Sequence, residues 1–323
     1  MVLHVWSQQA DASTAAAQLV VPPITEIQRV NALWRWNYTA VWNETQPYYK
    51  DPVQRALLAY LPAHPLTAEK VYDCWLPAAS IAVTWVNPDW VSRLFFYTDG
   101  SPMYGGWYPA AEWAQVQLWD PAYSNGTRHN FTVNVFNKSL TEDVPGGNWW
   151  HSALTQGFSQ MGQLPIDPAA SEQSYRIYGI HHNNGSFWHN NGIPAVAMAM
   201  LTGFSISIKT KGDYAGGVAE WFDAVKHARE SPVVVTTVAK ANITETDPVI
   251  HGNHAYAVLI AEQGDKVPPY PNGTQPGEGK RWARRMLMRN PWGSQDWYNA
   301  EDVWENLNYL NHLADFEKLE WAE

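Results

Sequence analysis

Cysteine is almost absent from this sequence, since Cys74 is the only one among 323 residues. One cysteine excludes any disulfide within the chain, whereas many secreted proteins have such disulfides. It leaves Cys74 as a single thiol. The chain is long enough to bury a large core, either as one two-lobed domain or as two small ones.

Long apolar runs and basic clusters are also scarce. No stretch of about 18 apolar residues occurs, so no membrane span is predicted. The net charge of −10 argues against nucleic acid as a partner, because phosphate binding needs basic patches. Residues 1–6 lack the basic end and the long apolar run of a signal peptide.

Hydrophobic residues and tryptophan are plentiful. Hydrophobic residues make up 46% of the chain, which is typical of a globular protein and not of a disordered one. The 19 tryptophans are expected in the core or in the walls of a cleft, because aromatic rings bury large areas.

Glycosylation sequons are more frequent than chance predicts. The content of Asn, Ser and Thr predicts about two Asn-X-Ser/Thr sequons, whereas the sequence has eight. This excess favours a secreted glycoprotein whose signal segment has been removed; the alternative is a cytoplasmic chain rich in these residues. The candidate acceptors are Asn37, Asn43, Asn125, Asn130, Asn137, Asn184, Asn242 and Asn272.

Several segments have a clear periodicity. Residues 74–86 predict a buried helix, with Asp73 as its N-cap and Pro77 in its first turn, and helices are also expected at 149–161 and 218–229. Residues 180–192 are expected to form a polar loop, in which a metal site at His181, His182 and His189 is an alternative to a solvated surface. Strands are predicted at residues 116–119, 131–136, 232–238, 255–261 and 284–288.

Three polar residues suggest acyl-transfer chemistry. Cys74 begins the first predicted helix, whose positive end favours the thiolate. His254 stands at the start of a predicted strand, three residues after His251, and Asn290 follows another strand. A thiolate can act as a nucleophile, an imidazole as its base, and an amide oxygen can hold that imidazole in one tautomer.

The residues around these three positions resemble the calpain family of papain-like cysteine peptidases. Calpain cores carry Gly-Asp-Cys-Trp-Leu-Leu-Ala-Ala, and residues 72–79 read Tyr-Asp-Cys-Trp-Leu-Pro-Ala-Ala. They carry Gly-His-Ala-Tyr-Ser-Val, and residues 253–258 read Asn-His-Ala-Tyr-Ala-Val. The family string Arg-Asn-Pro-Trp-Gly occurs unchanged at residues 289–293, and residues 149–154 and 193–203 are similar more weakly.

The resemblance implies an α+β, papain-like fold with two lobes. It implies an N-terminal extension at residues 1–45, a helical lobe with the nucleophile at 46–205, and a β-rich lobe with His254 and Asn290 at 206–323. Cys74, His254 and Asn290 would form the catalytic triad of an endopeptidase that hydrolyses polypeptides, and Trp292 would shield the His–Asn pair from water.

The resemblance also raises two questions of detail. Calpains place an oxyanion-binding Gln six residues before the cysteine, where this chain has Ala68. Calpain cores use calcium to bring the lobes together, so calcium is a possible regulator although the chemistry requires no cofactor. Asp296, Glu301 and Asp302 are calcium candidates, and a solvated acidic helix start is the alternative.

Other functions stay open at this point. Because the oxyanion Gln is absent, a catalytically impaired protease fold that acts as a binding protein is an alternative. An acyltransferase or peptide ligase would use the same triad with an amine in place of water. A tryptophan-rich carbohydrate-binding module would leave the three motifs unexplained.

Overall fold

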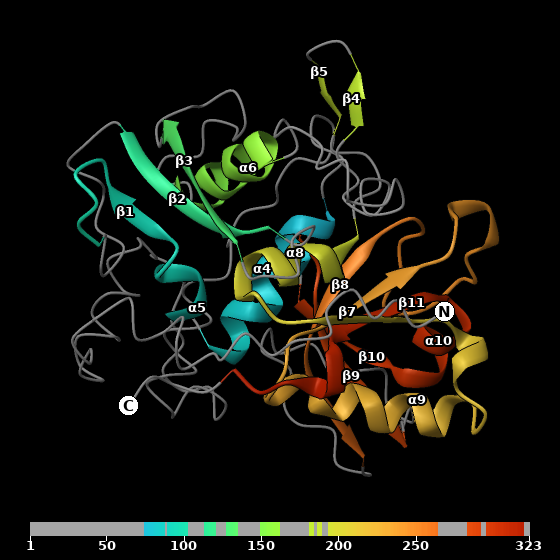
Figure 1. The fold of residues 1–323 in the computed structure, drawn as a ribbon. Helices are drawn as coiled ribbons and strands as arrows, with labels where there is room; N and C mark the ends of the chain where they lie inside the picture. Colours follow the sequence, from blue (N-terminus) through green and yellow to red (C-terminus); the bar gives the residue numbers. More distant parts are fainter. Residues whose placement is uncertain are drawn as a thin grey trace, which may run out of the picture.

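A computed structural model of the chain describes most of residues 74–319. The described residues are 74–87, 89–102, 113–120, 127–134, 149–161, 181–183, 186–188, 193–263, 283–291 and 295–319. The fold is α+β, as predicted, with antiparallel sheets on either side of a pair of central helices (Figure 1).

The larger sheet has six strands, and every neighbouring pair in it is antiparallel. Their order across the sheet is β10-β9-β8-β7-β11-β6, so the last strand in the sequence lies between β7 and β6. The strands are β6 (Ile206–Lys209), β7 (Val233–Thr237), β8 (Ala255–Gln263), β9 (Arg284–Arg289), β10 (Gln295–Asn299) and β11 (Leu307–Leu313).

Strand β8 is buried on both faces of this sheet. Its side chains point alternately to opposite sides, as in any strand. Ala257 and Leu259 enter the apolar core beneath the central helices, whereas Tyr256 and Val258 enter a second core on the other face. The resulting apolar run explains why the sequence predicts this strand so clearly.

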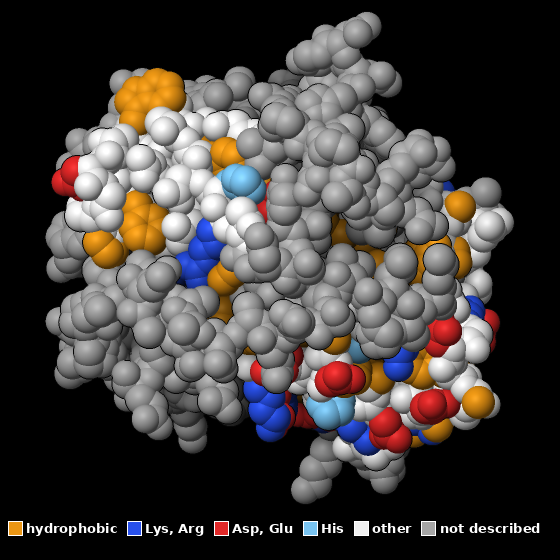
Figure 2. Space-filling model, in the orientation of Figure 1, with side chains coloured by type: hydrophobic (Ala, Val, Ile, Leu, Met, Phe, Trp, Pro, Cys, Tyr) orange, Lys and Arg blue, Asp and Glu red, His pale blue; other side chains and the backbone are white. Residues whose placement is uncertain are grey.

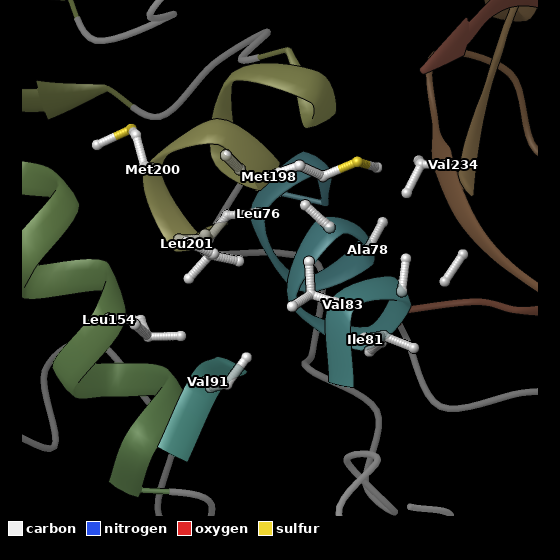
Figure 3. Packing of buried hydrophobic residues seen from close by; sticks show 14 of the residues in the cluster. Leu76, Ala78, Ile81, Val83, Val91, Leu154, Met198, Met200, Leu201 and Val234 are labelled. Carbon is white, nitrogen blue, oxygen red and sulfur yellow. The ribbon is translucent and has the colours of Figure 1, made fainter. Parts of the chain in front are cut away.

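Helices α4 (Trp75–Val86) and α8 (Pro194–Thr202) form the central pair, and every residue of both is buried. Both are rich in alanine, which allows close approach of two helix backbones, and a helix that is apolar all round is a core helix. Figure 3 shows Leu76 and Ala78 of α4 beside Met198 and Leu201 of α8. Val234 of β7 packs into the same cluster.

A three-stranded sheet, with the order β1-β2-β3, lies on the other side of the helix pair. Helix α6 (Trp149–Met161) packs on it so closely that a Cβ added at Gly157 would lie 3.1 Å from the Leu118 side chain. This half also contains the short helix α5 (Asp89–Ser92) and the strands β1 (Phe95–Tyr97), β2 (Trp113–Trp119) and β3 (Arg128–Asn134). The strands β4 (His181–Asn183) and β5 (Ser186–Trp188) form a separate hairpin.

The second face of the six-stranded sheet is covered by shorter helices. Trp221 and Phe222 of α9 (Val218–Val225) and Val303 of α10 (Ala300–Glu305) are buried against it. Figure 2 shows acidic and basic side chains interleaved on the visible surface of this half. The remaining turns are the 3-10 helices η2 (Lys211–Asp213), η3 (Lys226–Arg229), η4 (Lys240–Asn242) and η5 (Ala314–Phe316).

Most predicted elements are present, with three corrections. The predicted N-cap Asp73 is wrong by one residue, because Cys74 is the N-cap of α4. The predicted loop at residues 180–192 contains the β4–β5 hairpin, and the sequence pair Asn184-Gly185 between the two strands is a typical hairpin signal. The helix predicted at 218–229 changes at Lys226 from α9 to the tighter turn η3.

Candidate active site

Cys74 lies at the N-terminal end of α4. Its backbone is helical (φ −48°, ψ −25°), and its carbonyl accepts a hydrogen bond from the Ala78 amide at 3.1 Å. The residue is partly buried and packs against the core shared by α4 and β8. A sulfur at a helix N-terminus is near unpaired amides and the positive end of the helix dipole, and both favour the thiolate.

His254 and Asn290 come together although 36 residues separate them. His254 immediately precedes β8, and Asn290 immediately follows the neighbouring strand β9, where Arg289 lies opposite Ala257. The His254 Nε2 atom is 2.9 Å from the Asn290 Oδ1 atom, and each residue is only 4% exposed. Antiparallel pairing of β8 with β9 therefore produces this contact.

The hydrogen bond fixes the tautomer of His254. An amide oxygen can only accept, so Nε2 carries the proton and Nδ1 keeps a lone pair. Burial lowers the pKa of His254 to about 4, an effect that the Asn290 bond opposes and the nearby charge of His251 reinforces. The imidazole is therefore neutral near pH 7 and able to take a proton at Nδ1.

Tyr256 is a further residue of the site, beside the three that the motifs indicate. Its ring meets the His254 ring edge to face, with the centroids 4.9 Å apart. Its hydroxyl accepts a hydrogen bond from the His251 amide at 2.9 Å. Burial raises the pKa of Tyr256, the hydrogen bond from the His251 amide lowers it, and charge at Cys74 and Asp296 raises it further. The two-residue spacing from His254 along a strand is the sequence signal for it.

The calcium candidates do not form a cluster in the described part of the chain. Asp296 lies on β10, whereas Glu301 and Asp302 lie in the first turn of α10, as the alternative of an acidic helix start predicts. Glu301 is 2.7 Å from Arg284 in an ion pair. Among the described residues, which include His181 and His182 but not His189, no three His, Cys, Asp or Glu side chains gather in a way that would hold a metal ion.

Several other predicted positions fall outside the described residues, including Ala68, Trp292, residues 1–45 and six of the sequons. The two described sequon residues, Asn130 on β3 and Asn242 in η4, are both exposed, as a glycan would require. No helix in the described part of the chain is long and apolar enough to cross a membrane.

No model of a protein family matches the chain, and no curated protein matches it either. A thiol at a helix start, together with a neutral imidazole bonded to an amide, has the parts needed for acyl transfer.

Proposed function

We propose that this protein is a calpain-like cysteine endopeptidase with a papain-like, two-lobed fold. The observation that carries the proposal is the buried bond of 2.9 Å between His254 and Asn290. The three flanking strings, around Cys74, His254 and Asn290, support the same conclusion. A polypeptide would be the substrate, and the region between the α4 end and the start of β8 would be the reacting centre.

The first half of the reaction is acylation. The His254 Nδ1 atom takes the proton of the Cys74 thiol, and the sulfur attacks the carbonyl carbon of the scissile peptide. The C–N bond then breaks, and the protonated imidazole returns its proton to the leaving amine. The acyl group is left on Cys74 as a thioester.

The second half is deacylation. A water molecule gives a proton to His254 Nδ1 and attacks the thioester carbon. The C–S bond then breaks, the imidazolium returns its proton to the sulfur, and the Cys74 thiol is restored with a free acid product. Asn290 keeps the imidazole in one orientation through both halves. The amide N–H of Cys74 is one candidate donor to the oxyanion. Ala68 occupies the position of the glutamine that usually donates to the oxyanion, and loss of one such donor costs roughly 100- to 1000-fold in turnover.

Secretion, N-glycosylation and calcium regulation belong to the same proposal. The excess of sequons and the exposure of Asn130 and Asn242 support glycosylation. Calcium regulation is supported only by the resemblance of the motifs to calpain cores.

An impaired binding protein is the second candidate function, because Ala68 replaces the oxyanion glutamine. An acyltransferase is distinguished from a peptidase by product analysis with an added amine.

Labelling by an epoxysuccinyl inhibitor of cysteine peptidases, followed by intact mass, tests the proposal. Because Cys74 is the only cysteine, one adduct per chain is unambiguous. We expect rapid labelling of the wild type, none of Cys74→Ala, and labelling of His254→Ala slowed at least roughly 100-fold. His251→Ala is the matched control and should label like the wild type.

Hydrolysis of a protein substrate is measured beside the labelling. Labelling that needs His254, with cleavage that stops after labelling, supports the peptidase. A folded wild type whose thiol reacts with iodoacetamide but not with the epoxide contradicts it and favours the impaired binding protein. Release of an amine adduct in place of the free acid favours the acyltransferase.

A further inference from the structure

One hydroxyl group, that of Thr237, bonds to both ends of the turn that presents His254. Residues 252 and 253 form a turn between His251 and His254. The Thr237 hydroxyl donates to the His251 carbonyl at 2.6 Å and accepts from the His254 amide at 3.0 Å. It therefore bridges the first and last residues of the turn.

Thr237 meets His254 through its backbone as well. It is the last residue of β7, and its amide donates to the His254 carbonyl at 2.9 Å. The residue is only 4% exposed, so water does not easily replace these bonds. A hydroxyl is both donor and acceptor, whereas a valine of nearly the same shape is neither.

The backbone inside the turn needs this support. Asn253 has a left-handed conformation (φ 53°), which asparagine tolerates better than most residues, and its amide donates to the Val238 carbonyl at 2.8 Å. Gly252 lies so close to η4 that a Cβ there would be 2.4 Å from the Lys240 Cα atom. A turn in this conformation persists only where the neighbouring chain restrains it.

We propose that Thr237 is a positioning residue for His254, because its hydroxyl fixes the backbone from which the imidazole extends. The proposal rests on the proposed function, in which His254 is the base. The imidazole then has two anchors, which are Thr237 at the backbone and Asn290 at Nε2. Loss of the first anchor lets Nδ1 move away from the thiol without altering the groups that react.

Three variants test the role. Thr237→Val removes the hydroxyl and keeps the shape, and Thr237→Ser restores the hydroxyl. Thr236→Val is the matched control, because the Thr236 hydroxyl on the same strand bonds instead to the Tyr309 backbone, at 3.3 and 3.2 Å. If Thr237→Val does not fold, Thr237→Ala removes the hydroxyl without placing a methyl group where it was.

Two readouts are used, one kinetic and one spectroscopic. In Thr237→Val we expect kcat for peptide hydrolysis to fall roughly 10- to 100-fold, since a misplacement of about 1 Å costs this much, while KM changes less than about twofold. An NMR titration of the His254 Cε1–Hε1 signal should show a higher pKa of His254 in Thr237→Val than in the wild type, because the loosened turn admits water. Thr237→Ser should return both values to near the wild type, and Thr236→Val should leave both unchanged.

The outcomes separate this inference from the proposed function. Equal kcat and equal His254 titration in Thr237→Val and Thr236→Val would overturn the positioning role. If the wild type neither cleaves peptides nor reacts with the epoxide, the proposed function is wrong. The His254 titration then still decides whether Thr237 positions the imidazole, because it needs no substrate.

Discussion

Two buried histidines are expected to make the folded state lose stability in mild acid. Burial lowers the pKa values of His254 and His312 to about 4 each. His254 immediately precedes β8, and His312 lies in β11, on the other side of β7 in the sheet. The His312 Nδ1 atom is 2.6 Å from the Leu313 carbonyl oxygen, a bond that raises its pKa, while the charges of Lys209 and His227 lower it further.

The direction of the effect follows from the depressed pKa values. An unfolded histidine has a pKa of about 6.5, so below that pH the unfolded chain binds protons that the folded chain excludes. The stability that these neutral histidines contribute is complete above about pH 6.5 and is lost as the pH falls towards 4. At pH 4.5 the loss is on the order of 2 to 3 kcal/mol for each residue. Two such losses are a large part of a typical stability of roughly 5 to 15 kcal/mol.

Urea denaturation at several values between pH 7.5 and 4.5 measures this loss. Exposed carboxyls with lowered pKa values, Asp213 and Asp223 among them, act mostly below this range. His312→Asn keeps a hydrogen-bond donor near the Nδ1 position but does not titrate. The free energy of unfolding of this variant should therefore fall with decreasing pH about half as steeply as that of the wild type. A flat profile for the wild type, or the full slope in His312→Asn, would refute the reasoning.

Three further predictions concern the site and its surroundings. Asn290→Ala removes the acceptor at His254 Nε2, so kcat/KM should fall roughly 10- to 100-fold in a peptide assay, with Asn290→Asp measured beside it. Gly252→Ala should destabilise the fold by about 1 to 3 kcal/mol in urea titrations, because its Cβ would be 2.4 Å from Lys240. The control is Gly212→Ala, whose Cβ would meet its nearest atom at 3.6 Å, and equal losses would contradict the argument. Calcium should raise the melting temperature and speed inhibitor labelling relative to EGTA; identical values in both solutions would exclude calcium regulation.

Strong local patterns account for the elements that the sequence predicts well. Helix α4 is apolar in nearly every position, and α6 begins and ends at the predicted residues 149 and 161. Strands β6 and β11 were not predicted, because two of the three residues after Leu307 are exposed and β6 has only four residues. Their pairing depends on residues about 100 positions apart, which no local pattern contains.

The candidate site divides in the same way. The contact between His254 and Asn290 follows from motif strings that the sequence shows directly. Thr237 has no such string, because its role arises only when β7 pairs with β8 and brings its hydroxyl to a turn 14 to 17 residues later. The β4–β5 hairpin has a local turn signal, Asn184-Gly185, but its strands have only three residues each and lie in a polar segment, so the composition alone favours a loop.

The position of β11 between β7 and β6 constrains when the protein can fold during its synthesis. Among the described strands, β6 pairs with β11 alone, yet it leaves the ribosome about 100 residues earlier. Until residue 313 has emerged, β6 and one edge of β7 lack their partner, and a fold dominated by such distant pairings forms slowly. The nascent chain therefore exposes unpaired edges of β6 and β7 while about the next 100 residues are synthesised, and chaperones that cover such edges would protect it from aggregation during that interval.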